Sequence, residues 1–250
     1  AADHNYRTQG QVPASGNIAN FTEQRVLMAM RATIDNDEFN VDEGLIHAIG
    51  NSMGASGALT LGMRYPNIIS GIYGSQPMTN YASSPTFQSN FVQLWGQQTS
   101  NLQILNEGNE SSVIQRYGAG GNIPTGVWNW MNHLQQMTDR SADGFAFFAI
   151  DHGKADTTID WQTQGKPLVA ALTEARAGFS ANALAGVGHG WQAFAAVITQ
   201  LFGLGYGDEA PWRYPLTLSF PSITNASGSG AINPADSGND AYNMNIEWST

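Results

Sequence analysis

The chain has 250 residues, 20 of them acidic and 10 basic, and a formal net charge of −10. This balance argues against nucleic-acid binding, which needs a basic surface, and disfavours anionic membranes. With no cysteine, a hydrophobic content of 42% and no apolar run near 18 residues, the sequence excludes disulfides, thiolate zinc sites and thiol catalysis, and predicts a folded chain without a transmembrane span.

The first predicted helix covers residues 20–33. Asn20 and Glu23 have the spacing of a capping box, in which two side chains satisfy backbone N–H groups at a helix start. Residues 1–19 contain no convincing strand. The first four residues lack the basic and apolar regions of an intact signal peptide, although a signal could have been removed.

A strand, a sharp turn and a helix are predicted around Ser52. Apolar residues at 45–49 precede the pentapeptide Gly50-Asn51-Ser52-Met53-Gly54, and small and apolar residues follow it. This layout is typical of a nucleophile elbow, which strains the serine backbone and exposes its hydroxyl. We expect side chains at Gly50 and Gly54 to collide with the neighbouring strand or helix. The alternative is a structural glycine turn.

A carboxylate follows a clear strand signal further along the chain, at 145–150. Its continuous apolar run is typical of a parallel strand that is buried on both faces. Asp156 lies on the loop beyond it, where open α/β sheets collect ligands and catalytic groups. Asp151 is still at the strand end, and Asp160, one turn further on, is the main alternative acid.

A histidine held between two glycines follows a weaker strand signal at 179–187. Of the five histidines, only His189 lies beyond the acid on a glycine-rich loop. His133 falls in a predicted helix at 127–137, where a surface or packing role is expected. His152 belongs to the turn that presents the acid, where a structural hydrogen bond is expected.

The order Ser52, Asp156, His189 along the chain is the order of a serine-hydrolase triad. A neutral His189 would take the serine proton during attack, and Asp156 would fix the imidazole tautomer and stabilise the imidazolium. The N–H of Met53, at the start of the helix, would be one oxyanion donor. Such chemistry needs no metal and no organic cofactor.

These motifs resemble the α/β-hydrolase superfamily and, within it, secreted serine esterases related to polyhydroxybutyrate depolymerases and feruloyl esterases. The matching segments lie between about residues 20 and 200, at 20–27, 39–42, 51–54, 61–66, 152–156 and 188–190. The resemblance implies an α/β fold, with a mostly parallel sheet and flanking helices. It also implies a secreted or periplasmic location.

The N-terminal part departs from this family. Family members have several strands before the elbow, whereas only 51 residues precede Ser52 here. We therefore expect an open hydrogen-bonding edge on the elbow strand. Either the chain is a fragment or processed product, or another copy or a partner chain supplies the pairing. The second oxyanion donor stays unassigned.

Composition divides the chain into three parts. Residues 1–203 are expected to form the catalytic domain, with a cap or insertion at 75–125 that could equally be a packed pair of surface helices. Residues 204–213 form a Gly/Pro linker. Residues 214–250 show period-two alternation and predict a small C-terminal β appendage.

Two pairs of residues are candidate binding groups. Trp161 and Trp191, beside the acid and histidine loops, are expected either to wall an acyl or alcohol pocket or to pack in the core. Asp236 and Asp240 could bind calcium, but without a defined loop pattern a solvated turn is favoured.

The sequence thus predicts a hydrolase of carboxylic esters that acts through an acyl-serine. A serine peptidase of the prolyl-oligopeptidase type shares the triad order and is the nearest alternative. A non-catalytic hydrolase module, used for binding or assembly, is the alternative from another class. Whether the ester is a small molecule or a polymer is not determined by the sequence.

Overall fold

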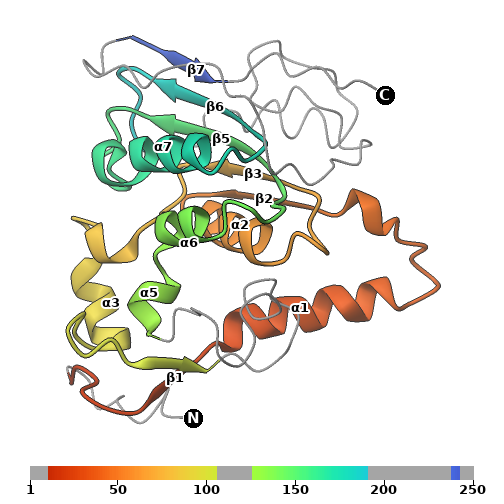
Figure 1. The fold of residues 1–250 in the computed structure, drawn as a ribbon, viewed down its shortest axis with the longest axis horizontal. Helices are drawn as coiled ribbons and strands as arrows, with labels where there is room; N and C mark the ends of the chain where they lie inside the picture. The colour runs from red at the N-terminus through yellow and green to blue at the C-terminus, as the bar shows by residue number, and fades with distance from the viewer. Residues whose placement is uncertain (1–10, 106–125, 191–237, 243–250) are drawn as a thin grey trace. The chain divides into compact units, whose positions relative to one another are not determined.

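The computed structural model describes residues 11–105, 126–190 and 238–242. The chain forms two compact units, one from residues 1–43 and 81–132 and the other from residues 44–80 and 133–250. Figure 1 shows the elements of each unit. None of the helices in these described ranges is long and apolar enough to cross a membrane.

The second unit is built on a five-stranded sheet with the order β2-β3-β5-β6-β7. The first four strands pair in parallel, and β7 pairs antiparallel with β6. The strands are β2 (His47–Asn51), β3 (Gly71–Ser75), β5 (Phe147–Gly153), β6 (Phe179–Leu184) and β7 (Asp240–Tyr242). The predicted α/β class with a mostly parallel sheet is therefore confirmed.

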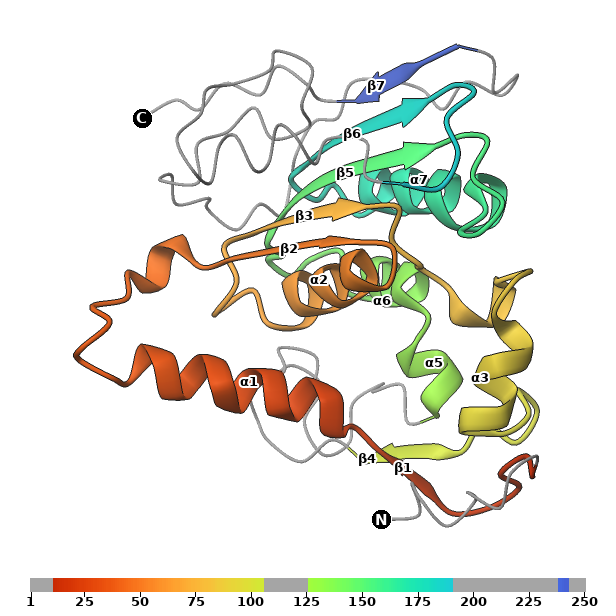
Figure 2. The same ribbon diagram turned by 180° about the vertical axis from the view of Figure 1, so that it is seen from behind.

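The described helices of this unit, α2 (Met53–Arg64), α6 (His133–Asp139) and α7 (Lys166–Glu174), lie on the same face of the sheet, as Figures 1 and 2 show from opposite sides. Every residue of β3 and β5 is buried, as expected for central parallel strands. A π-helical turn, Trp161–Gly165, leads directly into α7.

The first unit contains β1 (Asn17–Ala19), α1 (Phe21–Ile34), α3 (Gln88–Trp95), β4 (Gln103–Leu105) and α5 (Val127–Trp130). Strand β1 pairs in parallel with β4, so the expectation that residues 1–19 hold no strand is wrong. Helix α1 is present, but its start differs from a capping box. The Asn20 side chain donates to the Glu23 carboxylate, 2.6 Å away, and makes no backbone cap.

Two other segments depart from expectation. The helix predicted over 127–137 is two short helices, α5 and α6, separated at residues 131–132, and α5 belongs to the first unit. The only described part of the predicted C-terminal β appendage, β7, extends the main sheet beside β6. The linker predicted at 204–213 and most of the β appendage predicted after it lie outside the described residues.

Candidate active site

Ser52 occupies a strained turn between β2 and α2. Its φ of 54° and ψ of −116° lie in a region that residues with a β-carbon rarely adopt. The Ser52 N–H donates to the Ser75 carbonyl at 2.8 Å, which ties the turn to the end of the neighbouring strand β3. Strain of this kind is concentrated at functional sites, where surrounding contacts hold it in place. This backbone matches the predicted elbow.

The glycines on either side of Ser52 are not equivalent. A Cβ on Gly50 would overlap the Gly54 carbonyl carbon, so the first glycine is needed for the strand and helix to approach. At Gly54, no atom of the described residues lies within 4 Å of where a Cβ would be. The collision expected at Gly54 is therefore not found.

The structure brings Ser52, His189 and Asp156 together. His189 Nε2 lies 2.9 Å from the Ser52 hydroxyl oxygen, and His189 Nδ1 lies 2.8 Å from Asp156 Oδ2. Because a carboxylate only accepts, the neutral imidazole carries its proton on Nδ1 and presents a lone pair to the serine hydroxyl. The Asp156 side chain is fully buried, whereas that of His189 is 27% exposed.

The two oxygens of Asp156 have separate partners. Oδ1 accepts from the backbone N–H groups of Thr158 at 2.7 Å and Ile159 at 2.9 Å, which leaves Oδ2 to face His189. This arrangement fixes the carboxylate in a loop that could otherwise move. It also explains how a charge can be held in a buried position, because each oxygen accepts a hydrogen bond.

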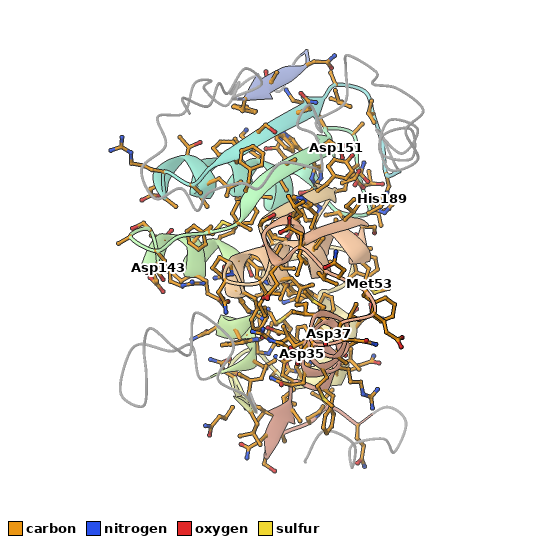
Figure 3. All side chains as sticks on the ribbon, turned by 90° about the vertical axis from the view of Figure 1, so that its right-hand side faces the viewer. Asp35, Asp37, Met53, Asp143, Asp151 and His189 are labelled. Atoms are coloured by element: carbon orange, nitrogen blue, oxygen red, sulfur yellow. The ribbon has the colours of Figure 1, made fainter. Side chains whose placement is uncertain are left out.

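The two alternative acids have other partners. Asp160 caps the turn at 161–165 by accepting from the Thr163 N–H at 2.8 Å. Asp151, labelled in Figure 3, belongs to the buried end of β5 and accepts from the Tyr73 hydroxyl at 2.7 Å. Burial raises the pKa of Asp151 to about 6. Of the three carboxylates considered from the sequence, only Asp156 is hydrogen-bonded to His189 in the described structure.

His152 supports the acid loop through a buried hydrogen bond. Its Nε2–H donates to the Ile159 carbonyl at 2.8 Å, so the structural hydrogen bond expected for this histidine is present. Burial lowers the pKa of His152 to about 4, which keeps the imidazole neutral near pH 7. The ring of Trp161 is also buried and lies 5.4 Å from that of His152, which supports the packing alternative for this tryptophan.

Three other candidates from the sequence have different outcomes. Trp191 and Asp236 lie outside the described residues. Asp240 accepts from the Lys154 ammonium at 2.7 Å, which ties β7 to the loop before the acid. Within the described ranges, no three His, Asp or Glu side chains gather closely enough to hold a metal ion.

Met53 is the first residue of α2, directly after Ser52. The N–H groups in the first turn of a helix have no acceptor inside the helix, and the helix dipole makes this end attractive to negative charge. Met53, which is labelled in Figure 3, is an exposed residue, with a relative accessibility of 86%. Its backbone N–H therefore has the chemistry required to bind an oxygen that becomes negative beside Ser52.

Sequence reasoning missed Gln76, the residue that follows β3. Its side-chain amide contacts both Gly188 and Gly190, the residues on either side of His189. A single glutamine after a strand carries no motif, and only the fold brings it to the histidine loop. No sequence signal identifies it.

No protein-family model matches this chain, and no curated protein matches it in sequence. Among solved structures, 77 chains match. One is an S-formylglutathione hydrolase from Agrobacterium tumefaciens, with a TM-score of 0.50 and 16% identity over 72% of this chain and 55% of that chain. Others are a truncated carbohydrate esterase from gut microbiota (TM-score 0.46, 15% identity, 73% and 67% covered) and a carboxylesterase from Lactobacillus plantarum (0.44, 13%, 74% and 68%).

The chain thus spans 55% of the length of the S-formylglutathione hydrolase that it matches. At 16% identity this likeness concerns the fold, and it agrees with the parallel sheet order and the helices described above. The chain has an α/β-hydrolase-type fold.

Proposed function

We propose that this chain is a serine hydrolase that cleaves carboxylic esters through an acyl-serine intermediate. The observation that carries the proposal is the continuous hydrogen-bonded row from Asp156 through His189 to Ser52, with contacts of 2.8 and 2.9 Å. A serine hydroxyl alone is a weak nucleophile at neutral pH, and a neutral imidazole at this distance is the base that it needs. The positive φ of Ser52 supports the same role.

In the acylation step, Ser52 Oγ attacks the ester carbonyl carbon while its proton moves to His189 Nε2. The carbonyl oxygen becomes negative and accepts from the Met53 N–H. The tetrahedral intermediate collapses as His189 returns the proton to the alcohol oxygen, and the bond between the carbonyl carbon and that oxygen breaks. The alcohol leaves, and the acyl group stays on Ser52.

Deacylation repeats these steps with water. His189 takes a proton from the water as its oxygen attacks the acyl carbon, and then returns this proton to Ser52 Oγ as the acid leaves. Asp156 keeps its carboxylate next to Nδ1 throughout, where it stabilises the imidazolium formed in each step. The two backbone N–H bonds to Oδ1 keep this carboxylate in place while the charge on the ring changes.

The ester class of the substrate rests on the motif resemblance to secreted serine esterases. Amide substrates require the same proton transfers, so the three side chains do not discriminate between them. A panel of p-nitrophenyl esters, a feruloyl ester and a polyester film, set beside p-nitroanilides with the same acyl groups, would separate an esterase from a peptidase.

Labelling with a fluorophosphonate tests the serine-hydrolase proposal directly, because the reagent phosphonylates only an activated serine. We expect one label per chain, which peptide mass spectrometry assigns to Ser52. The Ser52→Ala variant and the heat-unfolded wild type serve as controls and should remain unlabelled. If folded wild type is not labelled, or is labelled at another serine, the proposal is wrong and the non-catalytic alternative is favoured.

A further inference from the structure

Gln76 holds the loop that carries His189 from both sides of the histidine. Its Nε2 donates to the Gly188 carbonyl at 3.0 Å, and the Gly190 N–H donates to its Oε1 at 2.9 Å. One side-chain amide therefore spans the residue before His189 and the residue after it. The Gln76 side chain is fully buried, so water does not compete for these two bonds.

The backbone of Gln76 is itself fixed in an uncommon conformation. Its φ of 57° is in the left-handed region, which a residue with a β-carbon occupies only when its surroundings impose it. The Gln76 N–H donates to the Asp151 carbonyl at 2.8 Å, which anchors the residue to the end of the neighbouring strand β5. The amide thus projects from a rigid part of the sheet and not from a free loop.

Two described backbone bonds hold this loop before the histidine. Lys154 N–H donates to the Leu184 carbonyl at 2.8 Å, and Ala155 N–H donates to the Val187 carbonyl at 2.9 Å. After the histidine, Gly190 is held by Gln76, with a longer contact of 3.4 Å from the Ser75 hydroxyl to the Gly190 carbonyl. Among these contacts, only the Gln76 amide restrains both flanks.

Such restraint matters because His189 lies between two glycines. Glycine has the greatest backbone freedom of any residue, so this segment needs external contacts to keep one conformation. The imidazole is partly exposed and must stay within hydrogen-bonding distance of both Asp156 and Ser52. A shift of about 1 Å in a group of this kind can lower the rate about 100-fold.

We propose that Gln76 is a positioning residue that sets the place of the His189 imidazole between Asp156 and Ser52. Its amide is suited to the task because one end donates and the other accepts, matching the carbonyl of Gly188 and the N–H of Gly190. This inference rests on the proposed serine-hydrolase function and adds to it a residue that does not touch the reacting atoms.

Gln76→Met tests the inference, because it keeps the length of the side chain and removes both hydrogen bonds. We expect kcat to fall about 100-fold with little change in KM. Gln164→Met is the matched control: Gln164 is another fully buried glutamine, and its amide holds Thr79 and Asn80 instead of the histidine loop. It should lose thermal stability to a similar extent while keeping most of its kcat.

Gln76→Glu is the second variant, for use if Gln76→Met does not fold. The carboxylate still accepts from the Gly190 N–H but cannot donate to the Gly188 carbonyl, so we expect kcat to fall in this variant as well. In both variants the low-field proton resonance of the His189 Nδ1–H···Asp156 hydrogen bond should broaden or disappear, whereas Gln164→Met should retain it. A purely structural role would not move this signal selectively.

The rate of fluorophosphonate labelling separates failure of the inference from failure of the proposed function. If the wild type is not labelled, the serine-hydrolase proposal fails. If the wild type is labelled and the folded Gln76 variants are labelled at the same rate with an unchanged low-field resonance, the proposed function stands and the positioning role of Gln76 is wrong. Slower labelling of the Gln76 variants than of Gln164→Met supports the role.

Discussion

Gly153 at the end of β5 and Val187 in the histidine loop lie so close that no side chain fits at position 153. A Cβ there would overlap the Val187 carbonyl oxygen and would lie 2.7 Å from the Gly188 carbonyl oxygen. The approach lets the Ala155 N–H donate to the same Val187 carbonyl, at 2.9 Å. Backbone contacts alone therefore join the acid loop to the histidine loop, without the side chains of the acid and the histidine.

Gly153→Ala should therefore separate the two loops. The backbone carbonyls must move, and overpacking of this kind typically costs about 1–3 kcal/mol of unfolding free energy. We expect a lower Tm and a reduced kcat for ester hydrolysis. Gly188→Ala is the control, because a Cβ at 188 would meet only the Ala155 carbonyl oxygen, at 3.9 Å, among the described atoms. Equal effects of the two variants would contradict the steric explanation.

Ser52→Ala should abolish turnover of a short activated ester. Loss of one member of such a catalytic unit lowers kcat by about 10⁴- to 10⁶-fold. Circular dichroism and Tm should stay close to those of the wild type, since removal of one hydroxyl leaves little void. Retention of more than about a tenth of wild-type activity would refute the assignment of Ser52 as nucleophile, because so small a loss of activity is far below that expected when a nucleophile is removed.

Asp156→Asn should lower kcat by about 10⁴-fold, because an amide favours the wrong imidazole tautomer and cannot stabilise the imidazolium. Asp160→Asn is the informative comparison, since Asp160 is bound to the Thr163 N–H and not to His189. We expect only a mild loss of kcat/KM in that variant. Should Asp160→Asn be the more damaging, the acid would have to be reassigned to Asp160.

Asp151 should make the stability of the protein depend on pH in a defined direction. Burial raises its pKa from 3.8 to about 6, so the folded state binds the proton more tightly than the unfolded state does. Its contribution to stability is then greatest below pH 4 and is lost as the pH rises to about 6. Asp151→Asn should remove this pH-dependent loss of stability, because the amide does not titrate. The amide oxygen can still accept from the Tyr73 hydroxyl.

Urea unfolding of the wild type and of Asp151→Asn at pH 4 and pH 7 measures this effect. The free energy of unfolding of the variant minus that of the wild type should be greater at pH 7 than at pH 4, by on the order of 2 kcal/mol. Other titrating groups, including His152 with its lowered pKa, cancel in the difference between the two proteins. An identical difference at both pH values would show that Asp151 does not titrate in this range.

The positions of Ser52, Asp156 and His189 could be predicted because each follows a strand signal, and the carboxyl ends of parallel strands meet at one edge of a sheet. The choice between Asp156 and Asp160 could not be settled in this way. The two carboxylates are one turn apart, and only the loop conformation decides which one reaches the imidazole.

Other features could not be predicted from the sequence, each for a different physical reason. Strand β1 has three residues, too few to show alternation, and its pairing with β4 is a long-range contact. The break between α5 and α6 interrupts a continuous helical pattern, which local propensity does not reveal. Gln76 was missed because its role depends on two loops that meet only in the folded sheet.

In the sheet order, β2 is a terminal strand, and it pairs only with β3 in the described part of the chain. The described strands nearest the two termini pair with other strands: β1 pairs with β4, and β7 pairs with β6. An apolar strand at the end of a sheet favours pairing with another chain, and we therefore expect concentration-dependent self-association.

Ile49→Pro tests whether β2 mediates that association. The Ile46 carbonyl and the Ser52 N–H both bond toward β3, so the N–H of Ile49, three residues from each, points to the other side of the strand. Proline at 49 removes an outward donor and leaves the ladder to β3 intact, whereas Ala48→Pro, the control, removes an inward one. Light scattering at low micromolar concentration should show self-association of the wild type and its loss in Ile49→Pro, with folding retained. A wild type that stays monomeric across this range, or an Ile49→Pro variant that associates equally well, would remove the support for pairing through β2.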